Sequence, residues 1–185
     1  MDYIFSVVNP RIEPVYFVIA VIIAILTSII TKYYCYQGRM TRAQSIGAVF
    51  LIAYIFLVFA STVFSRTTML DYSYELIPFW SYQKILKGEK SLFWEDIFNV
   101  ILLIPMGIFL PIALTRGAEN DRRKRRRLFR RVTFIGFFFS LTIELLQLIT
   151  KRGLFEFDDI FHNTLGTVIG CWLCWKMRKR IIWIE

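Results

Sequence analysis

Ionisable and amide side chains gather in one segment of the chain, ELLQLITKRGLFEFDDIFHN, which runs from Glu144 to Asn163 between two apolar stretches. Glu144 and Gln147 are three residues apart, so they would share one face of a helix. Asp159 and Asn163, four residues apart, would share a face in the same way. Carboxylates can act as general acids or bases, and the guanidinium of Arg152 can pair bidentately with phosphate. The segment therefore predicts a polar site in which Glu144 and Asp159 are the candidates for a catalytic role.

Structural explanations remain open for the same residues. Glu144 would lie about 8 Å inside a membrane span, at about 1.5 Å per residue, where a charge is costly. A protonated Glu144 bonded to a neighbouring helix would then stabilise the fold and do nothing else. Asp158 or Asp159 could cap the helix that follows and interact with its dipole.

The elements around this segment are predicted to be membrane helices. Of the 185 residues, 56% are hydrophobic, and the mean hydropathy is +0.51, whereas soluble domains are only about 45–50% apolar. Long apolar runs predict an all-α, polytopic helical bundle that forms one membrane domain, residues 1–185. The five expected transmembrane helices are Val15–Thr31, Ser45–Phe64, Ile97–Leu114, Val132–Ile149 and Ile160–Trp175.

Three local patterns add detail to these spans. Pro105 removes a backbone hydrogen bond in the third span and predicts a kink that faces other helices. Gly166 and Gly170 in the fifth span have the G-x-x-x-G spacing that allows close helix packing. Between the second and third spans, the aromatic and charged stretch YELIPFWSYQKIL predicts a segment lying in the membrane interface, with a plain loop as the alternative.

The distribution of lysine and arginine predicts the orientation. Sixteen of the 23 basic residues fall in the loops after the first and third spans and in the C-terminal tail. Short loops rich in these residues stay in the cytoplasm. The N-terminus is therefore expected outside the cell and the C-terminus inside, with the Lys151–Asp159 turn on the outer side.

The same layout excludes some functions. The basic cluster Arg122–Arg127 lies between two spans, where it reports orientation and meets anionic lipid headgroups, so nucleic-acid binding is not expected. Cys35, Cys171 and Cys174 fall on or near the inner side, where thiols stay reduced. The C-W-L-C pair lacks two further zinc ligands. We expect no metal and no cofactor.

Under this topology, four spans deliver polar groups to one depth near the outer surface. Ionisable residues inside or beside the hydrocarbon indicate a functional site by default. The candidate ligand-binding residues are Arg66, Asn99, Glu144, Gln147, Arg152, Asp158, Asp159 and Asn163.

These residues also carry a resemblance. The segments FSRT, ELIPFW, NVILLIPMGIFLP and SLTIELLQLITKRGLFEFDDIFHNTLG resemble the VanZ-like family, named after a teicoplanin-resistance protein, over residues 64–170. By position, that family's recurrent polar residues fall on the eight candidates above and are followed by Gly166. His162 falls where the resemblance implies no fixed residue. The resemblance implies a multi-pass protein of the bacterial cell membrane that is linked to glycopeptide or lipoglycopeptide tolerance, and it implies no established reaction.

Three classes of function remain open at this point. A binding protein would hold a lipid-linked envelope precursor or a glycopeptide at the outer leaflet, with membrane lipids as further partners. An enzyme would modify an envelope lipid or glycan and would depend on Glu144 or Asp159 as acid or base. A small transporter would place ionisable groups near the midplane and usually shows internal repeats, and the sequence shows no repeat.

Overall fold

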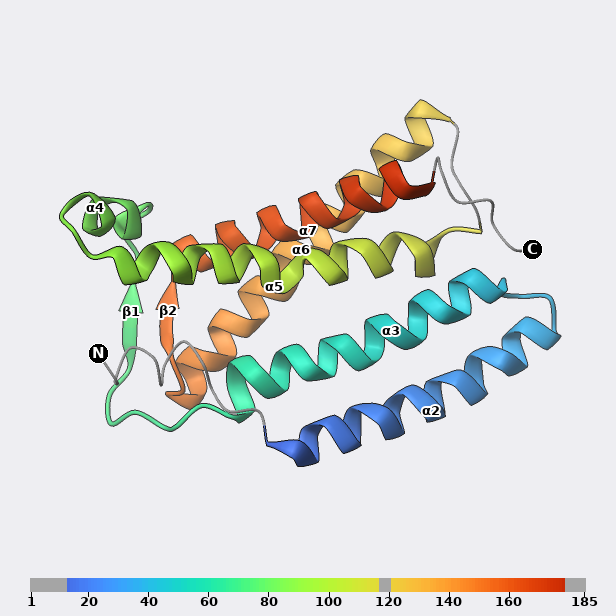
Figure 1. Ribbon diagram of the computed structural model, residues 1–185, viewed down its shortest axis with the longest axis horizontal. Helices are drawn as coiled ribbons and strands as arrows, with labels where there is room; N and C mark the ends of the chain where they lie inside the picture. Colours follow the sequence, from blue (N-terminus) through green and yellow to red (C-terminus); the bar gives the residue numbers. More distant parts are fainter. Residues whose placement is uncertain (1–12, 117–120, 179–185) are drawn as a thin grey trace.

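The computed structural model describes residues 13–116 and 121–178, and within them it shows a helical bundle (Figure 1). Its α-helices are α2 (Pro14–Tyr36), α3 (Arg42–Phe59), α4 (Trp80–Leu86), α5 (Lys90–Leu114), α6 (Arg122–Thr150) and α7 (Phe157–Arg178). A π-helical turn, η1 (Ala60–Phe64), continues α3. The expected all-α membrane bundle is therefore confirmed.

Four helices are long and apolar enough to cross a membrane: α2, α3 with η1, α5 and α6. Their positions match the first four expected spans. The fifth expected span is present as α7, which runs beside α5 along the length of the bundle (Figure 1). With Asp158 and Asp159 in its first turn, α7 does not belong to the four apolar helices.

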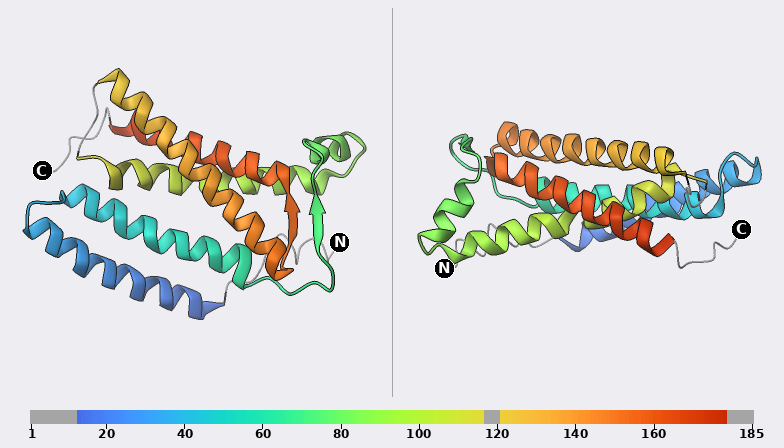
Figure 2. Two further views of the ribbon diagram at one scale, coloured as in Figure 1. Left: turned by 180° about the vertical axis from the view of Figure 1, so that it is seen from behind. Right: turned by 90° about the horizontal axis from the view of Figure 1, so that it is seen from above.

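Two short strands were not expected from the sequence. β1 (Ser73–Glu75) and β2 (Leu154–Glu156) pair in parallel, with Ser73 opposite Leu154 and Glu75 opposite Glu156. β2 follows the α6–α7 turn at Lys151, which has a left-handed backbone conformation. The strands join the long segment after η1 to the hairpin between α6 and α7. Together with α4 they mark one end of the bundle, which we call the strand end (Figure 2).

Close packing of α5 against α7 forms the centre of the bundle. A Cβ atom on Gly166 would collide with the carbonyl of Val100, and one on Gly170 would collide with the carbonyl of Ile104. Only glycine therefore allows the two backbones to approach this closely, which confirms the close contact predicted from the G-x-x-x-G spacing.

The apolar core lies between α3, α5 and α6 and includes Val58, Leu103, Met106, Val132 and Ile143. α5 continues as one helix through both of its prolines. The Tyr54 hydroxyl donates a hydrogen bond to the Leu102 carbonyl, three residues before Pro105. This bond joins α3 to α5 close to Pro105.

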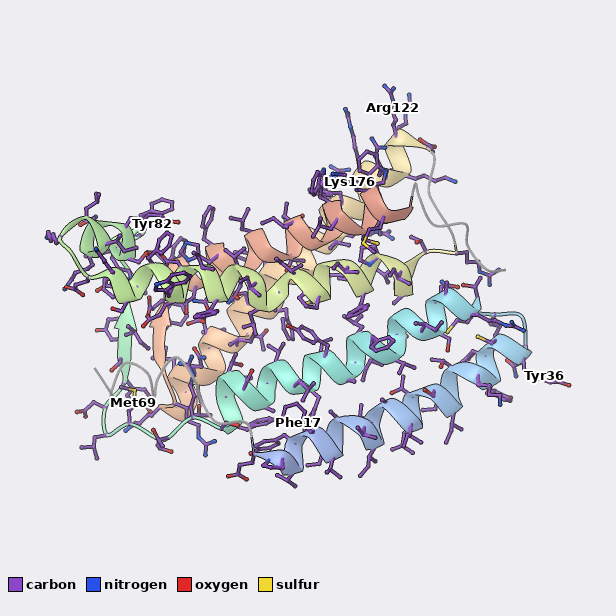
Figure 3. The ribbon with its side chains drawn as sticks, viewed as in Figure 1. Phe17, Tyr36, Met69, Tyr82, Arg122 and Lys176 are labelled. Carbon is purple, nitrogen blue, oxygen red and sulfur yellow. The ribbon has the colours of Figure 1, made fainter. Side chains whose placement is uncertain are left out.

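The segment expected at the membrane interface forms the short helix α4, which lies beside the start of α5 at the strand end (Figure 2). The basic start of α6 lies at the opposite end. Figure 3 shows this separation, with Met69 and Tyr82 at the strand end and Arg122 and Lys176 at the other.

Candidate functional site

The strand end brings together polar residues from five parts of the chain. Arg66 follows η1, Asn99 comes from the first half of α5, and Glu144 and Gln147 from the last two turns of α6. The connection between α6 and α7 carries Arg152, and the start of α7 carries Asp158, Asp159 and Asn163. The structure thus places all eight candidate residues at the same end of the bundle, where backbone and side-chain contacts link several of them.

Glu144 and Gln147 occupy one buried face of α6. Glu144 is 1% exposed, and its Oε2 accepts a hydrogen bond from the backbone N–H of Glu156 at 3.0 Å. Gln147 is also buried, and its Nε2 donates to the Thr62 carbonyl at 2.9 Å. These bonds attach α6 to β2 on one side and to η1 on the other. The shared face expected from the three-residue spacing is therefore present.

Asp159 connects α7 with α5. Asn99 Nδ2 donates a hydrogen bond to Asp159 Oδ1 at 2.6 Å, which joins residues 60 positions apart in the chain. The Asp159 carboxylate also lies close enough to Glu144 to repel its charge, and Arg66 attracts both carboxylates. The two catalytic candidates thus share one electrostatic environment.

Arg152 and Asp158 have structural partners. Arg152 Nη1 donates to the Phe64 carbonyl at 2.9 Å and lies 3.4 Å from that of Val63, so it satisfies backbone acceptors at the end of η1. Asp158 accepts from the backbone N–H groups of Phe79 and Ser81, at 2.5 and 3.2 Å, and from the Ser81 hydroxyl at 3.0 Å.

Asp158 therefore caps the N-terminus of α4. The cap is supplied from a distant part of the chain because Phe79, at the N-cap position, offers no side-chain acceptor and has a left-handed backbone conformation. From the sequence, Asp158 could have capped the helix that follows it, α7. In the structure it caps α4 instead.

Sequence reasoning missed a second group of polar residues. Glu95 and Asp96 precede Asn99 by about one turn of α5. The Tyr82 hydroxyl lies 2.8 Å from Nε2 of the buried His162, and Nδ1 of that histidine lies 3.4 Å from Asp96. The helical spacing of Glu95 and Asp96 from Asn99 was a signal that could have found them. Nothing in the sequence connected Tyr82 with His162.

Burial and nearby negative charges raise the pKa of two groups that lie outside the long helices. Burial, and then the negative charge of Asp159, raises the pKa of Glu156 to about 9, although the hydrogen bond that Trp80 Nε1 donates to it at 3.1 Å favours the charged form. Burial also raises the pKa of Tyr82, with smaller contributions from Asp96 and Asp158. Glu156 is therefore protonated at neutral pH, and the Tyr82 hydroxyl keeps its proton.

The acidic residues do not form a metal site of ordinary type. No group of three or more His, Cys, Asp and Glu side chains in the described part of the chain has positions that could hold a metal ion. Cys171 and Cys174 are buried thiols near the far end of α7. The polar groups at the strand end are carboxyl groups, amides and the guanidiniums of Arg66 and Arg152.

Comparison with known proteins identifies a family. A model of the VanZ/LLP1 family matches residues 46–182, which is more than half of the chain and includes the whole strand end. This match confirms the resemblance seen in the sequence and extends it on both sides of residues 64–170. No curated protein and no solved structure matches the chain.

Proposed function

We propose that this chain, which belongs to the VanZ/LLP1 family, is a multi-pass membrane protein whose strand end faces outward and binds a molecule of the bacterial cell envelope. The ligand would be a lipid-linked precursor or a glycopeptide. Binding at the outer leaflet would sequester the antibiotic or alter its access to the lipid-linked target, and would contribute to teicoplanin-type resistance.

One observation supports this proposal most directly. Polar groups from the segment after η1 and from α5, α6 and α7 converge at the strand end, where Glu144, Gln147 and Asn163 are buried. Buried polar groups in a membrane protein are costly unless they are paired or bind something. Arg66 Nε and Asn163 Oδ1 are shielded and have no hydrogen-bond partner among the described residues, and the charge of Arg66 acts on Glu144 and Asp159. These four are therefore the residues proposed to meet the ligand.

Catalysis on an envelope lipid or glycan is a second candidate, favoured by the proximity of Glu144 and Asp159. Two neighbouring carboxylates can divide the roles of acid and base between them. An enzyme would lose all activity with Glu144→Gln, because the amide cannot transfer a proton. A binding protein would tolerate this substitution better than Arg66→Ala.

The experiment is complementation of a strain that lacks the gene, with teicoplanin susceptibility as the readout. We expect Arg66→Ala and Asn163→Ala to lower the inhibitory concentration to that of the deletion strain, with membrane abundance unchanged on an immunoblot. The matched control is Leu145→Ala, next to Glu144 on the exposed face of α6. Full complementation by every site variant would contradict the proposal.

A further inference from the structure

The charge balance at the strand end differs from that of a phosphate site. Six carboxyl groups interact electrostatically here: Glu95, Asp96, Glu144, Glu156, Asp158 and Asp159. Of these, Glu156 is protonated at neutral pH and Asp158 is bonded to the start of α4. In the part of the chain that the structure describes, Arg66 is the arginine whose charge acts on this group: it influences Glu95, Glu144 and Asp159. His162 acts on Asp96. A ligand carrying only negative charge would meet more repulsion than attraction here.

Arg66 faces these carboxylates without touching them. Among the residues that the structure describes, it forms no ion pair and no hydrogen bond, and its Nε is shielded and unpartnered. Arg152, in contrast, is bonded to backbone carbonyls. A guanidinium beside carboxylates normally closes on one of them to form a bidentate pair. Here the two charges remain apart.

Gly153 helps to hold Arg66 in this position. A Cβ atom at residue 153 would lie 2.8 Å from Arg66 Nη1 and 3.2 Å from Gln147 Cδ. The absence of a side chain at this position lets the guanidinium lie against the α6–α7 turn, beside Gln147.

Unpartnered polar atoms lie beneath the charged layer. Thr167 on α7 packs against Gly136 on α6, and Asp159 lies near Glu144 one level further out. Because these helices are antiparallel, Ser140 and Asn163 occupy the level between. Both are buried, and Ser140 Oγ and Asn163 Oδ1 have no hydrogen-bond partner. Asn163 Oδ1 can only accept, so a donor is required at this level to satisfy it.

We propose that the ligand group held at this site is a zwitterion, with an ammonium directed to Glu144, Asp159 and Asn163 and an anionic group directed to Arg66. This inference rests on the proposed function and specifies its ligand class. An ammonium group has three N–H donors and no acceptor, which suits two carboxylates and an amide oxygen. The planar guanidinium suits a phosphate or carboxylate oxygen pair.

Two sources offer this chemistry: a phosphoethanolamine lipid headgroup, and the free amino and carboxyl groups of a short peptide. The test is calorimetric titration of the full chain in nanodiscs made from lipids without amines. The two zwitterionic probes are glycerophosphoethanolamine and the dipeptide alanylalanine. Glycerol phosphate is the matched anion and ethanolamine is the matched cation.

At least one zwitterionic probe should bind at least about tenfold more tightly than either singly charged probe, a difference of about 1.4 kcal/mol. The probe that binds identifies the source. Glu144→Gln should remove the preference over glycerol phosphate, and Arg66→Gln the preference over ethanolamine. Leu145→Ala should change neither. Each variant must show the thermal transition of a folded protein, and Asn163→Ala serves where Glu144→Gln does not fold.

Binding of glycerol phosphate as tight as that of the zwitterions, or binding of neither zwitterion, would overturn the inference. The complementation experiment is read separately. Loss of resistance in the site variants, without a preference for zwitterions, would leave the proposed function standing and remove the ligand class. A zwitterion preference without any effect of the site variants on resistance would support the ligand class and remove the proposed function.

Discussion

At the scale of single residues, adjacent aspartates have different roles. Asp158 binds backbone N–H groups at the start of α4 and caps that helix. Asp159 binds Asn99 on α5 and interacts with Arg66. Successive helical residues point about 100° apart, so two neighbours on α7 reach different parts of the molecule. From the sequence, both aspartates are predicted to make polar contacts. Which of them caps a helix and which belongs to the site depends on where α4 and α5 lie.

Glu156 gives a prediction for pH dependence. Its pKa is about 9 in the folded protein, above the ordinary value of 4.5. The folded state therefore holds a proton that the unfolded state releases, and stability should fall as pH rises from about 4.5 to about 9 and level off above. Glu156→Gln keeps an uncharged group there and should reduce this loss, by about 1 kcal/mol or more at the alkaline end.

Thermal unfolding in detergent at acidic pH and at about pH 9 measures this effect for the wild type and for Glu156→Gln. The control is Glu89→Gln, a change in an exposed glutamate that pairs with Lys84. A variant that loses as much stability on alkalinisation as the wild type would show that Glu156 is not the group responsible.

At the scale of elements, the sequence predicts the helices well and their contacts less well. Apolar length located the expected span Ser45–Phe64, which the structure shows as α3 with η1. The pairing of β1 with β2 escaped prediction because three-residue strands carry no usable periodicity. The contact of Tyr82 with His162 was not predicted either, because it depends on where α4 lies on the bundle.

Gly166 gives a prediction for the α5–α7 contact. In an isolated helix, replacing glycine with alanine stabilises by roughly 0.5–1 kcal/mol. In this protein the new methyl group would meet the Val100 carbonyl, so the helices must separate. We expect Gly166→Ala to destabilise the protein by about 1–3 kcal/mol, the range for overpacking.

The matched control is Leu165→Ala, the adjacent and partly exposed residue on α7. Leu165→Ala should change the free energy of unfolding little, because the Leu165 side chain is partly exposed and its neighbours there would be lipid and not protein. Denaturation in mixed micelles compares the two variants with the wild type. Stabilisation by Gly166→Ala would contradict the close packing of α5 and α7.

At the scale of the whole molecule, charge distinguishes the two ends of the bundle. The first turns of α6 carry the exposed arginines Arg122 and Arg123, while the strand end carries the carboxyl groups of the candidate site. Figure 3 shows Arg122 at the end opposite to Met69 and Tyr82. α2 lies at the edge of the bundle, packs on α3 and has few buried residues. The family match begins at residue 46, after α2. The family core is therefore the part from α3 to α7.

Orientation gives the last prediction. A cysteine at Lys87, beside α4, should react with a membrane-impermeant maleimide on intact cells. A cysteine at Asp121, before α6, should react only after the cells are made permeable, because basic loops stay in the cytoplasm. The background carries Cys35→Ser and keeps the buried Cys171 and Cys174. Labelling of position 121 on intact cells would place the strand end in the cytosol and remove the outward site.

The pairing of β1 with β2 has a consequence for biogenesis. Translation delivers β1, α4 and the spans up to α6 before the partner strand and the capping residue Asp158 emerge from the ribosome. Until α7 is inserted, α4 lacks its cap and Glu144 lacks the backbone donor of Glu156. The newly made protein therefore passes through a stage in which the four apolar helices are complete and the polar contacts of the strand end have not formed, and an incompletely packed protein is the form most exposed to quality-control proteases.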